Sequence, residues 1–148
     1  MDPAAPTPRE RLAAAGLRTT VQRVAVLQVI ERREHLDADQ IRDRVTGQIG
    51  KVSTQAVYDV LKALSEAGLL RKIQPAGSSA LYELRVADNH HHLICRSCRK
   101  ILDVDCAHGA APCIEPDDDH GFVLDEAEVI YWGLCADCAH VSSALPQN

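Results

Sequence analysis

The first seventy residues place their apolar side chains at the spacing of helices that bury one side. The pattern predicts four helices, each with a capping residue before it or a glycine after it. The expected helices cover residues 9–16, 20–32, 37–46 and 53–68. Their starts are marked by Thr19 or Thr20, by a capping box of Asp37 and Gln40, and by Ser53, and their ends by Gly16 and Gly68.

The helix expected over 53–68 separates its apolar and polar residues onto opposite sides. The apolar side consists of Ala56, Val57, Val60, Leu61 and Leu64. The polar stripe consists of Gln55, Tyr58, Asp59 and Lys62. Two apolar segments, 69–73 and 80–84, then flank the turn-forming sequence QPAGSS and predict a β-hairpin. Helices followed by such a hairpin are the order of a winged helix-turn-helix.

From Asp88 onward the pattern changes to short strands. Strands are expected over 90–94, 100–105, 122–126 and 128–134, with a short helix over about 110–119. The predicted fold class is therefore α+β. We expect a winged-helix DNA-binding domain at residues 1–87 and an α/β domain with a small antiparallel sheet at residues 88–148.

The composition, with 46% hydrophobic and 25% charged residues, is ordinary for a soluble globular protein. No apolar run approaches the ~18 residues of a membrane span, and the Pro- and Ala-rich start lacks the pattern of a secretion signal. We therefore expect a cytoplasmic protein with no membrane partner. In that compartment the six cysteines favour metal binding or redox chemistry over structural disulfides.

Charge is distributed unevenly along the chain. The net charge of −5 argues by itself against nucleic-acid binding. However, residues 1–86 carry 13 Lys and Arg against 10 Asp and Glu, whereas residues 87–148 carry 3 against 11. The first half can therefore approach a polyanion, and the second can hold cations. Uneven solvation of a single domain is the alternative.

The polar stripe of the 53–68 helix suits contacts with base edges, and nearby basic residues suit contacts with phosphates. Gln55 can pair with adenine and Tyr58 can contact a phosphate or a thymine methyl, whereas Asp59 is unusual on such a surface. The candidate DNA-binding residues are Arg18, Thr20, Arg23, Lys51, Ser53, Thr54, Gln55, Tyr58, Asp59 and Lys62, with Arg71 and Lys72 on the hairpin. The alternative is that the stripe is only the solvated face of an amphipathic helix.

Two Cys-x-x-Cys pairs supply the four thiolates that a tetrahedral structural Zn(II) requires. The four residues are Cys95, Cys98, Cys135 and Cys138. A thioredoxin-like redox pair is the alternative, but one Cys-x-x-Cys would suffice for it.

A second kind of metal site is expected beside the first cysteine pair. On a strand, His90 and His92 project to one face and His91 to the other. The cysteine turn folds the next strand back, which brings Asp103 and Asp105 near them. Imidazoles with a carboxylate suit Fe(II), Mn(II), Zn(II) or Ni(II). A solvated run of histidines is the alternative.

These features together resemble the ferric uptake regulator family of metal-dependent bacterial repressors. The resemblance covers about residues 10–140 and rests on AGLRTTVQR, STQAVYDVLKAL, YEL followed by HHHLICRSCRKILDVD, and CADC. It is greatest to the actinobacterial branch that controls catalase-peroxidase genes. The resemblance implies a homodimer that binds operator DNA and represses transcription. Residues 88–148 would form the dimerisation domain, and the four cysteines would bind structural Zn(II). Asp59 stands where iron regulators often have Arg, so their usual operator is not implied.

The resemblance further implies a regulatory Fe(II) or Mn(II) ion between the two domains. Its ligands would be His35, Glu83, His90, His92 and Asp103. His35 and Glu83 lie in the first domain, so one ion would bridge both domains and favour a closed dimer that fits the operator.

Many family members carry a further metal site, whose histidine and glutamate positions are Ala127 and Ala110 in this chain. Any such site here would be a variant, for which the candidate ligands are His91, Glu115 and His120.

The resemblance also bears on the signal. Peroxide regulators of the family tend to have Asp at the position of Asp103, so peroxide sensing is expected, with hydrogen peroxide oxidising His35 or His90 at bound Fe(II). Iron, zinc, nickel or manganese sensing is the alternative. Cys106 and Cys113 lie outside the zinc pattern and suit a thiol redox sensor, spare metal ligands or core positions.

An enzyme and a metal-storage protein are the rival classes. A catalytic zinc needs an open coordination position and a positioned base, and four thiolates leave no such position. We therefore expect no enzyme, and specific metal-dependent DNA binding would exclude storage.

Overall fold

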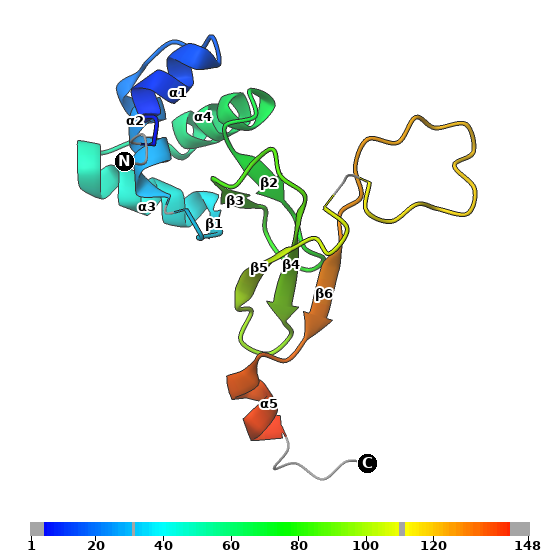
Figure 1. Cartoon of the computed structure of the whole chain (residues 1–148). Helices are drawn as coiled ribbons and strands as arrows, with labels where there is room; N and C mark the ends of the chain where they lie inside the picture. Colours follow the sequence, from blue (N-terminus) through cyan, green and yellow to red (C-terminus); the bar gives the residue numbers. More distant parts are fainter. Residues whose placement is uncertain (1–4, 31, 110–111, 143–148) are drawn as a thin grey trace. The chain divides into compact units, whose positions relative to one another are not determined.

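The structure, a computed structural model, describes residues 5–30, 32–109 and 112–142. The chain divides into two compact units, Met1–Ala87 and Asp88–Asn148 (Figure 1). Within the described ranges, no helix has both the length and the apolar character needed to cross a membrane.

In its described residues, the first unit consists of four helices and a three-stranded sheet. The helices are α1 (Pro8–Ala14), α2 (Val21–Val29), α3 (Ala38–Ile49) and α4 (Thr54–Glu66). The strands are β1 (Leu36–Asp37), β2 (Arg71–Ile73) and β3 (Leu81–Glu83). They form an antiparallel sheet in the order β1-β3-β2, in which β2 and β3 are the expected hairpin. The unit is a winged helix-turn-helix.

Side-chain caps fix where these helices begin and end. The Thr20 hydroxyl accepts a hydrogen bond from the N–H of Arg23 (3.2 Å) at the start of α2. At the start of α3, Asp37 and Gln40 form the expected capping box, with reciprocal hydrogen bonds of 2.8 and 3.0 Å. Beyond α4, Gly68 adopts a left-handed conformation (φ 71°) that a side chain would disfavour. These local signals explain why the four helices could be predicted.

Among the helices, the ends of α2 and α3 differ most from the sequence expectation. α2 ends at Val29 rather than near Arg32, because Ile30 takes an extended backbone and is buried there. α3 continues through Gly47 instead of ending at Thr46.

The core of the first unit is aliphatic and draws on all four helices. Val57, Leu61 and Leu64 are the α4 side chains in it, and each is at most 2% exposed. Burying this side of α4 leaves the opposite polar stripe facing solvent, which is the orientation a recognition helix needs.

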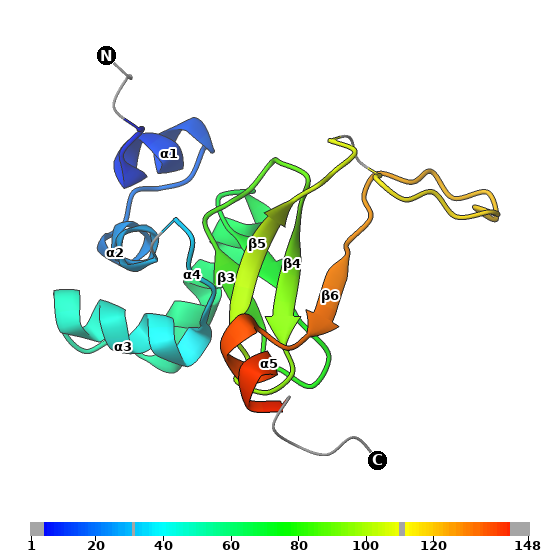
Figure 2. The same cartoon turned by 60° about the horizontal axis from the view of Figure 1, so that its bottom comes forward.

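The second unit is built on a separate three-stranded sheet. β4 (His90–Cys95) is its central strand, with β5 (Ile101–Asp105) antiparallel on one side and β6 (Ile130–Gly133) parallel on the other (Figure 2). The expected antiparallel pairing therefore holds for β4 and β5, whereas β6 joins in parallel. α5 (Ala136–Ser142), which was not predicted, lies at the end of the sheet beside the β4–β5 turn (Figures 1 and 2).

A long connection joins β5 to β6 and leaves the sheet as an extended loop (Figure 1). The helix expected over 110–119 does not form in its described part, residues 112–119, where Pro112 and Pro116 oppose one; positions 110–111 lie outside the described residues. The strand expected over 122–126 is also wrong, because no strand in the described chain pairs with it.

The second unit has little apolar core of its own. Among its described residues, Ile94 and Cys95 are the buried hydrophobic ones, whereas Leu93, Leu102 and Tyr131 of the sheet are 42–50% exposed. So small a core needs a further source of stability, such as a metal or a second chain.

Candidate metal centres and DNA-binding surface

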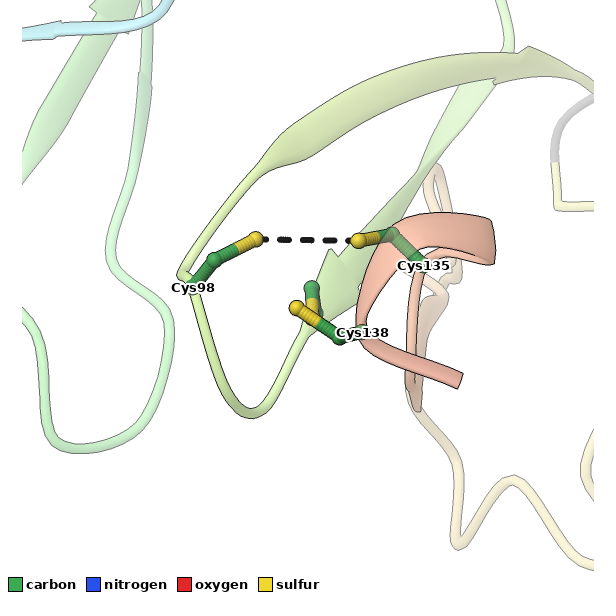
Figure 3. Close-up of side chains that lie close together, drawn as sticks. Cys98, Cys135 and Cys138 are labelled. Carbon is green, nitrogen blue, oxygen red and sulfur yellow. Dashed lines mark hydrogen bonds between the residues drawn. The ribbon is translucent and has the colours of Figure 1, made fainter. Parts of the chain in front are cut away.

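Four cysteines meet at the end of the second sheet. Cys95 ends β4, Cys98 lies in the following turn, Cys135 precedes α5 and Cys138 lies within it. Their sulfur atoms all lie within 4.8 Å of one another. The Sγ atoms of Cys98 and Cys135 point toward each other at 3.7 Å (Figure 3). Zn–S bonds of about 2.3 Å at tetrahedral angles place sulfurs roughly 3.8 Å apart, so the four thiolates fit Zn(II).

Backbone hydrogen bonds shape the first cysteine turn. The N–H of Cys95 donates to the carbonyl of Lys100 (2.9 Å), and the N–H of Arg99 donates to the carbonyl of Cys95 (3.1 Å). Arg99 closes the turn in the left-handed region (φ 66°). The N–H of Arg96 donates to the carbonyl of Gly133 (2.8 Å), which ties the turn to β6 just before the second cysteine pair.

The Cys95 thiol is prepared for metal ligation. Hydrogen bonds from the backbone N–H groups of Cys135 and Cys98 lower its pKa to about 6. A lowered pKa favours the thiolate, which is the form that binds metal.

Two histidines and a carboxylate face one another across β4 and β5. His92 and Asp103 are partners in register, and His92 Nε2 lies 3.5 Å from Asp103 Oδ1. His90 Nε2 lies 3.9 Å from the same oxygen, and the two rings meet edge to face at 4.9 Å. Asp88 Oδ1 lies 2.5 Å from His90 Nδ1, which leaves Nε2 turned toward Asp103. Asp105, also expected here, lies opposite His90 in register.

The first unit holds an imidazole–carboxylate pair of its own. His35 precedes β1 and Glu83 ends β3, and His35 Nε2 lies 2.8 Å from Glu83 Oε2. Arg71, opposite Glu83 in the hairpin register, places its Nε 3.9 Å from Oε1. The sequence pattern alone did not single out His35 or Glu83, because each is an isolated residue in its own segment.

His91 projects to the other face of β4, where it meets two cysteines. Its Nε2 lies 3.0 Å from Cys113 Sγ, and one ligand atom each from His91, Cys106 and Cys113 lies within 4.8 Å of the others. Burial raises the pKa of Cys106, but hydrogen bonds from the backbone of His108 and Gly109 and from Cys113 outweigh it and lower the pKa. The cysteines that had no place in the zinc pattern therefore cluster with the histidine left over from the triplet.

The structure does not bring Glu115 and His120 to His91. Glu115 lines a separate acidic hollow in the long loop, and His120 Nδ1 lies 3.3 Å from Asp118 Oδ2. Two consecutive left-handed residues, His120 and Gly121, turn the loop at this point.

The polar stripe of α4 is exposed as expected, with Tyr58 47% accessible. Gln55 Nε2 donates to Asp59 Oδ1 (2.8 Å), so the unusual acidic residue orients the amide beside it. Asp59 also lines a hollow of about 250 Å³ together with Arg18, Thr20 and Arg23. Ser53 serves as the N-cap of α4, and Lys51, Lys62 and Lys72 are exposed.

Arg42 is a candidate DNA contact that the sequence reasoning missed. Its Nη1 donates to the Thr54 hydroxyl (2.9 Å), which places a guanidinium at the N-terminus of α4. Asp39 and Asp43 lie 3.4 and 3.3 Å from the same guanidinium. The sequence could not show that Arg42 of α3 points to α4, because the contact with Thr54 joins two different helices.

A winged helix-turn-helix together with clusters of cysteine and of histidine and carboxylate side chains that could hold metal ions is typical of a metal-responsive transcriptional regulator. Residues 14–132 match the Ferric uptake regulator family. The chain is 59% identical over 130 residues to "Transcriptional regulator FurA" of Mycobacterium tuberculosis (strain ATCC 25618 / H37Rv), covering 88% of each chain. It is 56% identical over 121 residues to "Ferric uptake regulation protein 1" of Mycolicibacterium fortuitum, covering 82% of this chain and 75% of the relative.

Solved structures agree with this fold. The ferric uptake regulator of Pseudomonas aeruginosa with manganese superimposes with a TM-score of 0.67 at 23% identity, covering 88% of this chain and 99% of the other. The chain belongs to the ferric uptake regulator family, which confirms the resemblance seen in the sequence. Members of this family are transcriptional regulators and not enzymes.

Proposed function

We propose that the chain is a homodimeric repressor whose operator binding depends on a regulatory Fe(II) or Mn(II) ion and is lost on exposure to peroxide. The observation that supports this proposal is that each unit presents a group of imidazole and carboxylate side chains. The first unit pairs His35 with Glu83 at 2.8 Å. The second unit directs His90 and His92 at Asp103, at 3.9 and 3.5 Å. Imidazole and carboxylate are ligands that suit Fe(II) and Mn(II).

Neither partial set is complete by itself. His35 and Glu83 give two ligands, and the second unit gives three, so full coordination would require both units to contribute. Metal binding would then shift the population toward the arrangement that fits the operator. By linkage, operator DNA would raise the affinity for the metal by the same factor.

The four-cysteine cluster would serve a different role. We assign structural Zn(II) to Cys95, Cys98, Cys135 and Cys138, because four thiolates close a tetrahedral ion and leave no position for a signal molecule. The ion would cross-link the β4–β5 turn to α5 in a unit that has little apolar core.

The long loop supports assembly into a homodimer. Phe122 and Val123 are 71% and 98% exposed, in a segment that the sequence predicted to be a strand and that pairs with no strand in the described chain. A second copy of the chain would cover these side chains and offer the missing partner.

Operator recognition would use α4 and the residues around its N-terminus. Gln55, held by Asp59, would read a base edge, and Tyr58 and Lys62 would lie beside it on the same stripe. The proposed phosphate contacts are Arg18, Thr20, Arg23, Lys51, Ser53 and Thr54, with Arg71 and Lys72 on the wing and Arg42 as the addition from the structure.

The metal dependence is tested with DNA that the Mn(II)-loaded chain selects from a random pool, followed by fluorescence anisotropy. Wild-type protein should bind this DNA only with Mn(II) or Fe(II), and His92→Ala should lose the metal-dependent binding. His108→Ala, a histidine outside the ligand set, is the matched control and should behave as wild type. Equal binding by metal-free protein or by His92→Ala would refute the regulatory site.

The proposal that peroxide is the signal rests on Asp103, the carboxylate that the family resemblance links to peroxide regulators. A peroxide signal implies control of oxidative-stress genes such as catalase-peroxidase. With Fe(II) bound, hydrogen peroxide would be reduced: its O–O bond would break, one oxygen atom would enter an imidazole C–H bond of His35 or His90, and the other would leave as water. The weakened ligand set would then release the DNA. Mass spectrometry should find this oxygen in Fe(II)-loaded protein and not in Mn(II)-loaded protein.

Iron responsiveness is the second candidate, and the name of the Mycolicibacterium fortuitum relative favours it. Iron sensing would be supported if the histidines stayed unmodified after peroxide treatment and DNA binding followed the iron concentration. A Cys106–Cys113 disulfide that forms with either metal and releases DNA would instead select thiol sensing.

A further inference from the structure

We propose that His91, Cys106 and Cys113 form a further metal site, which takes Zn(II) as a thiophilic ion. The site lies in the second unit and shares no residue with the four-cysteine cluster or with the regulatory ligand set. It does not depend on the proposed function.

The three side chains come together from segments that differ in structure. His91 lies in the middle of β4, opposite Val104 in register, and is 3% exposed. Cys106 follows the last residue of β5, and Cys113 lies in the long loop before β6. His91 Nε2 is 3.0 Å from Cys113 Sγ, and the three potential ligand atoms lie within 4.8 Å of one another. A convergence of one imidazole and two thiols at this distance is the donor arrangement of a metal centre.

The donor types select the ion. Two thiolates and one imidazole are softer than the histidine and carboxylate donors of the regulatory set, and they favour Zn(II) over Fe(II), Mn(II) or Mg(II). Three protein ligands leave a tetrahedral ion with one open position, unlike the closed four-cysteine cluster. A hollow of about 340 Å³ borders the three side chains and leaves room for a solvent ligand. The ion would therefore be exchangeable.

Binding would join three parts of the second unit. The ion would fasten the start of the long loop, through Cys113, to β4 and to the end of β5. The same loop carries Phe122 and Val123 further along, so zinc at this site would restrict the segment that presents these exposed side chains.

Zinc counting tests the site on the full-length chain. Native mass spectrometry, with zinc as the only added metal, should find one ion fewer per chain in Cys106→Ala and in Cys113→Ala than in wild type. The matched control is His108→Ala, which alters a side chain lining the same hollow but outside the ligand group, and it should bind as many ions as wild type. Unchanged zinc content in both cysteine variants would overturn the proposal.

Alkylation of the wild-type protein gives a second measurement that needs no variant. Added zinc should slow the modification of Cys106 and Cys113 by N-ethylmaleimide, as mapped by peptide mass spectrometry. Equal rates with and without zinc would count against the site. So would a Cys106–Cys113 disulfide that forms in air equally fast in both samples.

Discussion

Asp59 shows how one hydrogen bond changes the meaning of a residue. An acidic side chain on a DNA-facing helix would repel phosphates, yet its Oδ1 accepts from Gln55 Nε2 at 2.8 Å. The Gln55 amide keeps a second N–H and its oxygen, which are the two groups that pair with adenine. The hydrogen bond to Asp59 therefore orients the Gln55 amide on the exposed face of α4.

Gln55→Ala should weaken binding to the selected operator by about 1–3 kcal/mol and reduce discrimination between operator and random DNA, because a bidentate base contact is lost. Lys51→Ala is the control. It should weaken binding to both DNAs alike and reduce the salt slope by about one unit, as expected for a phosphate contact. Anisotropy titrations at several salt concentrations measure both effects. Equal weakening on both DNAs by Gln55→Ala would show that it contacts the backbone only.

At the scale of elements, we expect the sheet of the second unit to depend on a metal ion bound at its end. β4, β5 and β6 bury few apolar side chains, and the cysteine turn is tied to β6 through the hydrogen bond from Arg96 to Gly133 (2.8 Å). Zinc on the four thiolates would hold this turn to α5. The first unit has an aliphatic core of its own and no such need.

Removal of zinc with a strong chelator should therefore speed amide hydrogen exchange throughout β4, β5, β6 and α5, while exchange in α2, α3 and α4 stays as it was. Exchange followed by mass spectrometry locates the change, and adding zinc back should reverse it. Unchanged protection of the second sheet in zinc-free protein would contradict a structural role for the ion.

The helices with local capping signals could be predicted from the sequence, whereas strand pairing and the short helix α5 could not. The helices α2, α3 and α4 were predictable because Thr20, Asp37 and Ser53 accept hydrogen bonds from N–H groups three residues further on. The segment 122–126 has a strand pattern, but pairing is non-local and the described chain supplies no partner. α5 is a single short helix that follows a cysteine without a strong apolar period.

The candidate metal ligands also divide into groups that local sequence patterns could reveal and a group that only tertiary contacts bring together. The spacing of the Cys-x-x-Cys pairs identified a four-thiolate group, and strand alternation placed His90 and His92 on one face with Asp103 opposite. The grouping of His91 with Cys106 and Cys113 could not be predicted, because Cys113 lies in a loop without periodicity and its position is set by tertiary contacts.

At the scale of the whole molecule, we propose that one ion draws ligands from both units. A shared ion would make the ligands of the two units energetically dependent on each other. If one ion needs the ligands of both units, removing either set abolishes metal-dependent operator binding. Removing the other set as well then causes no further loss. With two independent ions, each single variant would instead lose part of the metal-dependent operator binding, and the two losses would add in the double variant.

The most direct test is a double-mutant cycle in which Mn(II)-dependent operator binding is measured for wild type, His35→Ala, His92→Ala and the double variant. We predict that each single variant loses the Mn(II) response completely and that the double variant binds DNA as weakly as either single one. A partial loss in each single variant, with losses that add in the double variant, would contradict a shared ion.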